Sequence, residues 1–139
     1  MRIFSFSFSL SVAVTACAMY PYSVVDTNEV VRFMNVKFSY GIQSLSTFMR
    51  SSVFTCEKPG LYMVSVDIVS NTYDAFLVIV KNDVILSGAY VSFEKNHLWY
   101  SGSATTALTL NSGDRVFIRS MRDGVKIHDY SCFTIIKIN

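Results

Sequence analysis

The chain has 139 residues, which is the length of one domain and leaves no room for a second. Hydrophobic residues make up 51% of the sequence and charged residues only 16%, a composition that excludes a disordered protein. The net charge of +2 is too small to predict nucleic-acid binding through long-range attraction. Because the apolar content exceeds what one core should need, we expect a further buried surface between subunits.

The first 18 residues have two interpretations. A short positive start, an apolar stretch and the ending Ala16-Cys17-Ala18 are typical of a secretory signal peptide, whose cleavage after Ala18 would leave a domain over 19–139. Apolar and polar side chains also alternate from Phe4 to Val14, which predicts a half-buried first strand and a domain over 3–139. The stretch is too short and too rich in serine for a membrane span of about 20 residues.

Short apolar runs separated by turn residues continue from Val24 onward, and no stretch keeps the spacing of a long amphipathic helix. A serine-rich loop is expected after Gly41, and Tyr90 to Tyr100 is predicted as either strand or loop. The predicted strands are Val30 to Phe38, Ser52 to Cys56, Leu61 to Val69, Tyr73 to Val80, Val84 to Ala89, Ser103 to Leu110, Arg115 to Met121 and Ser131 to Ile138. About eight to ten strands at this spacing predict an all-β sandwich or jelly roll.

The three cysteines are Cys17, Cys56 and Cys132, and their spacing fits no zinc motif. At least one of them stays unpaired within the chain. One interpretation is a disulfide between Cys56 and Cys132, and the other is that the cysteines are small buried hydrophobic residues.

Four sequence blocks, taken in order, resemble the C1q domain family. Phe54 is followed after five residues by Gly60-Leu61-Tyr62, residues 77–83 read LVIVKND, residues 101–117 contain SGSA and LTLNSGDRVF, and residues 130–133 read YSCF. The segment before Phe54 is longer than the family pattern, and Asp83 stands where glycine is usual. The positions of these blocks to which we assign structural roles are Phe54, Gly60, Tyr62, Gly113, Asp114 and Phe133.

The resemblance implies a ten-stranded jelly-roll β-sandwich of the C1q and tumour-necrosis-factor (TNF) type. It also implies a secreted, extracellular recognition domain that forms a homotrimer and binds protein, glycan or pathogen-surface ligands, as in innate immunity or adhesion. The family's collagen stalk, which needs glycine at every third position, has no counterpart in this sequence. Two alternatives remain: a TNF-like signalling ligand, and a small structural β protein or enzyme.

Candidate catalytic and metal-binding residues follow no recognised pattern. His97 and His128 lie in no catalytic signature, so we predict that the protein is not an enzyme. No cofactor is expected, with calcium kept as an alternative, although no loop has the regular spacing of a calcium motif. The aspartates that could supply calcium ligands are Asp26, Asp67, Asp74, Asp114, Asp123 and Asp129.

Basic residues gather in the last third of the chain, at Arg115, Arg119, Arg122 and Lys126. They have two interpretations: a solvated strand face, or a site for anionic ligands such as acidic glycans, anionic lipids or envelope phosphates. On the second interpretation, replacing the last three with glutamine weakens binding and leaves the melting temperature nearly unchanged. Four aromatic residues have three interpretations, as part of the core, of a trimer contact or of a sugar-stacking surface. They are Tyr90, Phe93, Trp99 and Tyr100.

Overall fold

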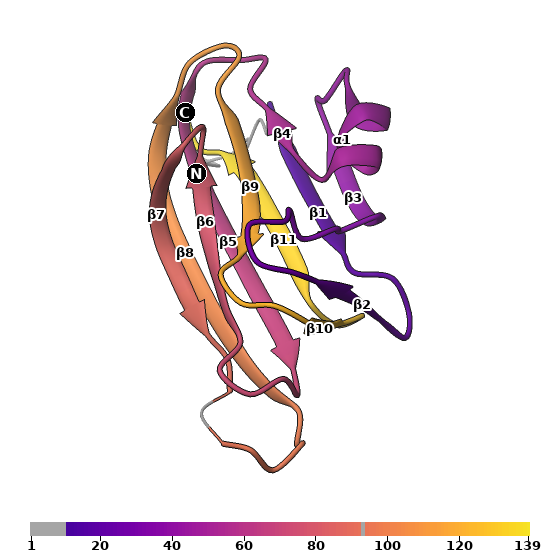
Figure 1. Cartoon of the computed structure of the whole chain (residues 1–139). Helices are drawn as coiled ribbons and strands as arrows, with labels where there is room; N and C mark the ends of the chain where they lie inside the picture. The colour runs from indigo at the N-terminus through magenta and orange to yellow at the C-terminus, as the bar shows by residue number, and fades with distance from the viewer. Residues whose placement is uncertain (1–10, 93) are drawn as a thin grey trace, which may run out of the picture.

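A computed structural model describes residues 11–92 and 94–139 of the chain as a jelly-roll sandwich of antiparallel sheets (Figure 1). One sheet has five strands in the order β3-β1-β11-β5-β8, and the other has four in the order β4-β9-β6-β7. A separate pair, β10-β2, lies at the lower end in Figure 1. The strands are β1 (Ala13–Cys17), β2 (Tyr22–Val25), β3 (Asn35–Tyr40), β4 (Phe54–Thr55), β5 (Gly60–Ser70), β6 (Phe76–Lys81), β7 (Val84–Tyr90), β8 (Tyr100–Leu110), β9 (Arg115–Ser120), β10 (Val125–His128) and β11 (Cys132–Lys137).

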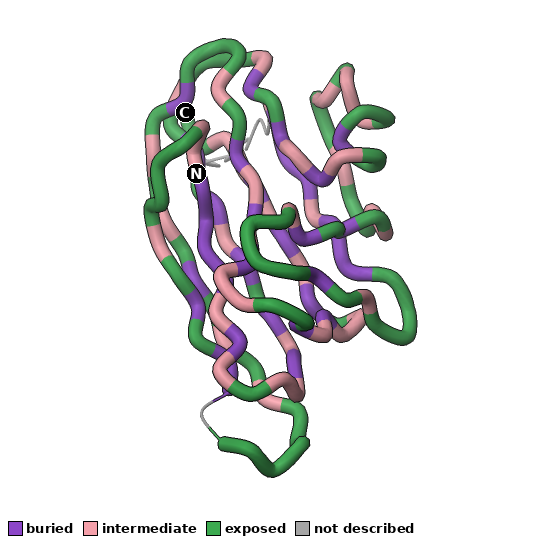
Figure 2. Tube along the Cα trace, in the orientation of Figure 1, coloured by how far each residue is buried: buried purple, intermediate pink, exposed green. Residues whose placement is uncertain are grey.

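The core lies between the two large sheets and follows the period-two pattern of the strands. In β5 every second side chain is fully buried, including Tyr62, Val64 and Ile68. A strand places successive side chains on opposite faces, and β-branched residues pack well there. Burying one such side chain contributes roughly 1.5–3 kcal/mol. Figure 2 shows the buried segments along the strands, whereas residues 94–99 at the lower end are exposed.

The structure confirms most of the predicted strands and adds three elements. The pair β2 and β10 was not predicted, because four-residue strands are too short to show a period. The segment 30–38 was predicted wrongly: its strand runs over Asn35–Tyr40, and Val30 makes only an isolated bridge to Arg119. Residues 91–99 form the connection between β7 and β8.

A short helix, α1 (Leu45–Ser51), replaces part of the expected serine-rich loop. The Glu57 carboxylate accepts hydrogen bonds from the backbone N–H and hydroxyl of Ser44, at 3.1 and 2.8 Å, just before the helix begins. Ser52 ends it in a left-handed conformation and donates its N–H to Phe48. Since Phe48 is its only buried residue, the helix leaves no apolar periodicity in the sequence.

The amino-terminal strand β1 lies inside the five-stranded sheet, paired with β3 and β11. Most of the alternating stretch that predicted a strand from Phe4 to Val14 falls in residues 1–10, outside the described residues. The strand that the structure describes comes at the end of that stretch, over Ala13–Cys17.

The disulfide between Cys56 and Cys132, one of the two interpretations of the cysteines, is wrong, because Cys132 is bonded to Cys17. These two cysteines are directly opposite each other on the adjacent strands β1 and β11. Cys56 is a buried free thiol, as the alternative interpretation has it for this residue. A pairing across 115 residues depends on strand register, which cysteine spacing does not reveal.

Candidate functional site

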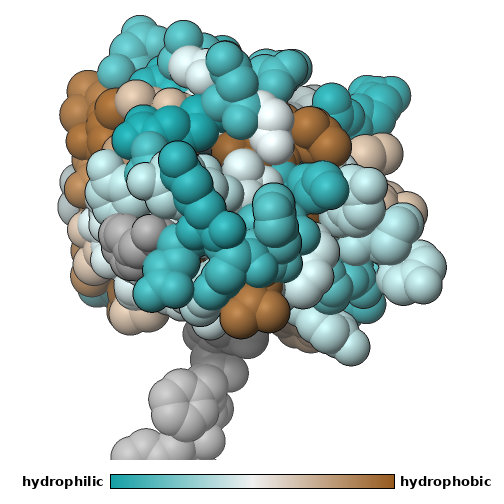
Figure 3. Space-filling model, turned by 60° about the horizontal axis from the view of Figure 1, so that its bottom comes forward, coloured by the Kyte–Doolittle hydropathy of each residue, from teal (hydrophilic) through white to brown (hydrophobic). Residues whose placement is uncertain are grey.

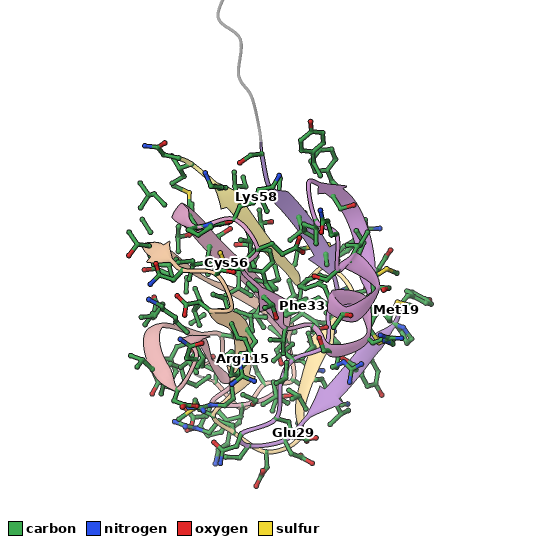
Figure 4. The ribbon with its side chains drawn as sticks, turned by 90° about the horizontal axis from the view of Figure 1, so that it is seen from above. Met19, Glu29, Phe33, Cys56, Lys58 and Arg115 are labelled. Carbon is green, nitrogen blue, oxygen red and sulfur yellow. A yellow bond between two sulfur atoms is a disulfide. The ribbon has the colours of Figure 1, made fainter. Side chains whose placement is uncertain are left out.

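The motif residues around β4 and β5 form a packed structural unit. The Phe54 and Tyr62 rings lie 5.9 Å apart, and the Tyr62 hydroxyl donates to the Lys58 carbonyl at 2.5 Å. The Cys56 thiol donates to the same carbonyl at 3.3 Å, and Figure 4 shows Cys56 and Lys58 close together. Burial raises the pKa of the Tyr62 hydroxyl. A side chain at Gly60 would meet the backbone carbonyl of Asn139, so this position requires glycine.

The other motif residues also hold the fold. Gly113 has φ of +90°, a left-handed conformation that favours glycine, in the turn between β8 and β9. Asp114 accepts a hydrogen bond from the Asn111 N–H at 2.8 Å, which, together with Asn82, lowers the pKa of its carboxyl. Phe133 is buried in the core, 5.5 Å from the ring of Phe33.

The structure separates the four basic residues proposed to bind ligands. Arg115 is exposed at the start of β9. Arg119 has a buried Nε atom without a hydrogen-bond partner in the described part of the chain. The Arg122 Nε donates to Asp74 at 2.9 Å, which raises the pKa of Arg122. Lys126 lies on β10 and lines a pocket.

This pocket, called the end pocket below, has a volume of about 420 Å³. The two connections that contribute to its lining lie at the lower end of Figure 1. The β5–β6 connection, the β7–β8 connection and β10 supply its lining. Figure 3, in which this end comes forward, shows a mostly hydrophilic surface. The lining residues are Asn71, Thr72, Tyr73, Lys95, His97 and Lys126.

Short-range contacts place the two lysines of the end pocket. The Lys126 N–H donates to the Thr72 hydroxyl at 3.0 Å, which joins β10 to the β5–β6 connection. The Lys95 ammonium lies 4.9 Å from the centre of the Tyr73 ring. The Lys126 ammonium lies 5.1 Å from the centre of the Tyr22 ring. Sequence reasoning identified Lys126 but not the other lining residues, because three distant segments meet here.

An aromatic cluster lies beside the end pocket, on the β7–β8 connection and at the end of β10. Trp99, two residues after His97, has its ring 4.9 Å from that of His128, two residues after Lys126. The His128 ring lies 5.0 Å from Tyr130. Trp99 is 43% exposed and Tyr130 is 75% exposed. Of the aromatic residues singled out in the sequence, Trp99 therefore lies at the surface.

The outer face of the five-stranded sheet carries a row of apolar side chains. Strand register places one residue from each strand side by side, and we call this set the apolar row. Tyr40 is 55% exposed and Met63 is 44% exposed, whereas Ala13, which lies between them in the row, is buried. The members of the apolar row are Tyr40, Ala13, Ile136, Met63 and Ala107.

Neither histidine is arranged as a general base beside a nucleophile. His128 Nδ1 lies 2.9 Å from an Asp129 oxygen and accepts the Tyr130 N–H at 3.1 Å. No serine, threonine or cysteine side chain is hydrogen-bonded to a histidine within residues 11–92 and 94–139. Activation of such a nucleophile requires that contact.

Three of the aspartates considered for calcium are engaged in other contacts. Asp74 pairs with Arg122 and Asp114 lies 3.8 Å from Lys81, while Asp67 accepts the Ser103 hydroxyl at 2.6 Å. Among the described residues, no group of three or more histidine, cysteine or acidic side chains is placed to hold a metal ion.

Comparison with known proteins places this geometry in a family. The family model described as C1q domain matches residues 13–134. The globular domain of zebrafish complement 1qA is 19% identical, with a TM-score of 0.74 over 92% of this chain and 98% of that one. Eiger TNF from S. frugiperda is 16% identical, with a TM-score of 0.71 over 94% of each chain. Murine APRIL is 13% identical, with a TM-score of 0.69 over 91% of this chain and 98% of that one.

A search of curated proteins finds no significant match. Among the described residues, no helix has the length and apolar character needed to cross a membrane. The solved structures share the jelly roll at low identity and therefore establish the fold. The family model covers most of the chain, including all four blocks noted in the sequence up to residue 134. The chain belongs to the C1q domain family.

Proposed function

We propose that the protein is a secreted recognition domain that acts as a homotrimer and binds protein, glycan or surface ligands. The apolar row is the observation that carries this proposal. An exposed apolar sheet face in water favours association with a partner of similar character. C1q domains typically associate in threes, so a second and a third copy of this chain are the occupants that we infer.

The composition supports the same conclusion. The sandwich already has a dense core, and large side chains such as Phe38, which is 53% exposed beside the apolar row, remain outside it. Interfaces between permanent subunits resemble a domain core cut in half. Association through this sheet would leave the loops of the end pocket available for ligands. The TNF-like alternative shares the fold but has no sequence block in its favour.

Light scattering on the full chain tests the homotrimer. We expect a mass near three times the 15.6 kDa of one chain at micromolar concentration. Met63→Glu places a charge in the middle of the apolar row and should give monomers, because burying an unpaired carboxylate is costly. Ile85→Glu is the matched control, since Ile85 is 47% exposed on β7 of the other sheet. A monomeric wild type, or a trimer that withstands Met63→Glu, would contradict the proposal.

A further inference from the structure

We propose that the end pocket binds an acidic sugar, a monosaccharide unit whose carboxylate or sulfate is held by Lys95 and Lys126. This inference rests on the proposed recognition role and names its ligand class. It moves the anion site away from Arg115, Arg119 and Arg122, because Lys126 is the only one of the four basic residues that lines the end pocket.

Uncompensated positive charge is the first argument. Neither Lys95 nor Lys126 has a carboxylate within ion-pair distance in the described parts of the chain, and no acidic residue lines the end pocket. The neighbouring carboxylate of Asp74 is already engaged with Arg122. The ammonium groups therefore remain available, and hydrogen bonds between ions of opposite charge are among the strongest polar contacts in proteins.

Preorganisation of the β7–β8 connection is the second argument. The Asn96 side chain accepts the Leu98 N–H at 3.1 Å and donates to the Tyr100 hydroxyl at 2.5 Å, so both of its polar groups hold this segment. His97, the residue between Asn96 and Leu98, has a left-handed backbone with φ of +60°, which is uncommon outside glycine. Such conformations cost free energy and cluster at binding sites. The contacts fix the backbone segment that carries His97 at the pocket wall.

Size and chemistry point to a sugar rather than to a bare ion. The volume of about 420 Å³ lies within the usual range for small-molecule sites, roughly 300–1,000 Å³, and is far larger than a sulfate ion needs. Asn71 and Thr72 offer side-chain donors and acceptors for hydroxyl groups. The aromatic cluster of Trp99, His128 and Tyr130 offers an apolar surface beside the pocket for the face of a sugar ring.

A ligand series on one ring separates these contributions. The wild-type chain, labelled with nitrogen-15, is titrated with glucose, glucuronic acid, glucose 6-sulfate and inorganic sulfate, and amide shifts are followed by NMR. We expect both acidic sugars to shift residues 71–73 and 95–99 and to bind at least about tenfold more tightly than glucose, the effect of one charged hydrogen bond. The stronger of the two identifies carboxylate or sulfate as the preferred group. Inorganic sulfate should bind more weakly than either.

Matched charge variants locate the site. Lys95→Gln with Lys126→Gln should weaken acidic-sugar binding at least about tenfold and remove its salt dependence. Lys58→Gln with Arg115→Gln makes the same change of charge at the opposite end, the end that Figure 4 views, and should leave affinity within about twofold. Equal losses in both variants would show general attraction and overturn the pocket. Binding of glucose as tight as that of the acids, or of sulfate as tight as that of the sugars, would overturn the ligand class.

Light scattering on the same samples keeps this test apart from that of the homotrimer. A trimer that binds none of the acidic sugars contradicts the end pocket alone. A monomer that binds them contradicts the assembly alone. The melting temperature of the Lys95 and Lys126 variant should equal that of the wild type, so that lost binding is not lost folding.

Discussion

Cys17 and Cys132 face each other across adjacent strands and close a loop of 115 residues with one disulfide. The bond joins the first described strand to the last. Two strands distant in the sequence thus become a covalent unit in the middle of the five-stranded sheet.

Removing this disulfide should lower stability. A crosslink over a loop of this length restricts the unfolded chain, and its loss typically costs about 2–5 kcal/mol. We expect Cys17→Ala with Cys132→Ala to lower the free energy of unfolding by that amount in urea denaturation. Reductant should destabilise the wild type and leave the double variant unchanged. A double variant as stable as the wild type would show that the bond adds nothing to the fold.

The mature chain should retain residues 12–17. Val12, Val14 and Ala16 are buried in the core, and cleavage after Ala18 would remove both β1 and Cys17. We expect amino-terminal sequencing of protein secreted by a eukaryotic host to begin before Val12. Secreted protein that begins at Met19 would instead support the signal-peptide interpretation of residues 1–18.

Gly60→Ala, and more strongly Gly60→Val, should lower the melting temperature. The added atom would collide with the Asn139 carbonyl, which accepts the Leu61 N–H at 2.7 Å and completes the sheet. Overpacking of this kind costs about 1–3 kcal/mol. Gly113→Ala is the control, since it also has a positive φ but has nothing within 4 Å of the new atom. A smaller effect at Gly60 than at Gly113 would rule out the collision.

Asp114 should contribute stability that acid removes. The Asn111 N–H and the Asn82 amide lower the pKa of this carboxyl below its ordinary value of 3.8. A lowered pKa in the folded state stabilises the fold above that ordinary value and loses its effect as pH falls through the folded value. We expect Asp114→Asn to be less stable than wild type near neutral pH and to approach it in strong acid. Asp83→Asn, in the neighbouring hairpin turn, is the control. In thermal melts its stability should change with pH in the same way as that of the wild type.

Arg122→Gln should lower the melting temperature, whereas Arg115→Gln should not. The Arg122 guanidinium binds Asp74 and lies 5.5 Å from the Phe76 ring centre, and Phe76 stacks on Tyr90 at 4.1 Å. Arg115 is exposed, and its guanidinium makes no hydrogen bond or ion pair within the described chain. We therefore expect glutamine at Arg119, Arg122 and Lys126 together to lower the melting temperature, which differs from the expectation drawn from the sequence. Equal melting temperatures for the two single variants would remove the role assigned to the Asp74 pair.

Local pattern was sufficient for the strands that build the sandwich. In β5, β8 and β9 a period of two, ended by turn residues, records which side chains face the core, and in β6 a continuous apolar run marks a strand buried along its length. The position of Gly113 likewise follows from a local backbone demand, whereas Gly60 is required by the distant Asn139 carbonyl. The family and its fold could be recognised because these demands recur at the same spacing along the chain.

Contacts between distant segments decided the rest. Helix α1 depends on Glu57, thirteen residues after Ser44, and the disulfide depends on the register of β1 against β11. The basic residues near the carboxyl end looked like one cluster in the sequence, but Asp74 engages Arg122, whereas Lys126 lines the end pocket together with Lys95. Sequence spacing gives the order of these groups along the chain. Ion pairing depends on distance in space. Only the packing of three segments, the β5–β6 connection, the β7–β8 connection and β10, therefore decides which charges stay uncompensated.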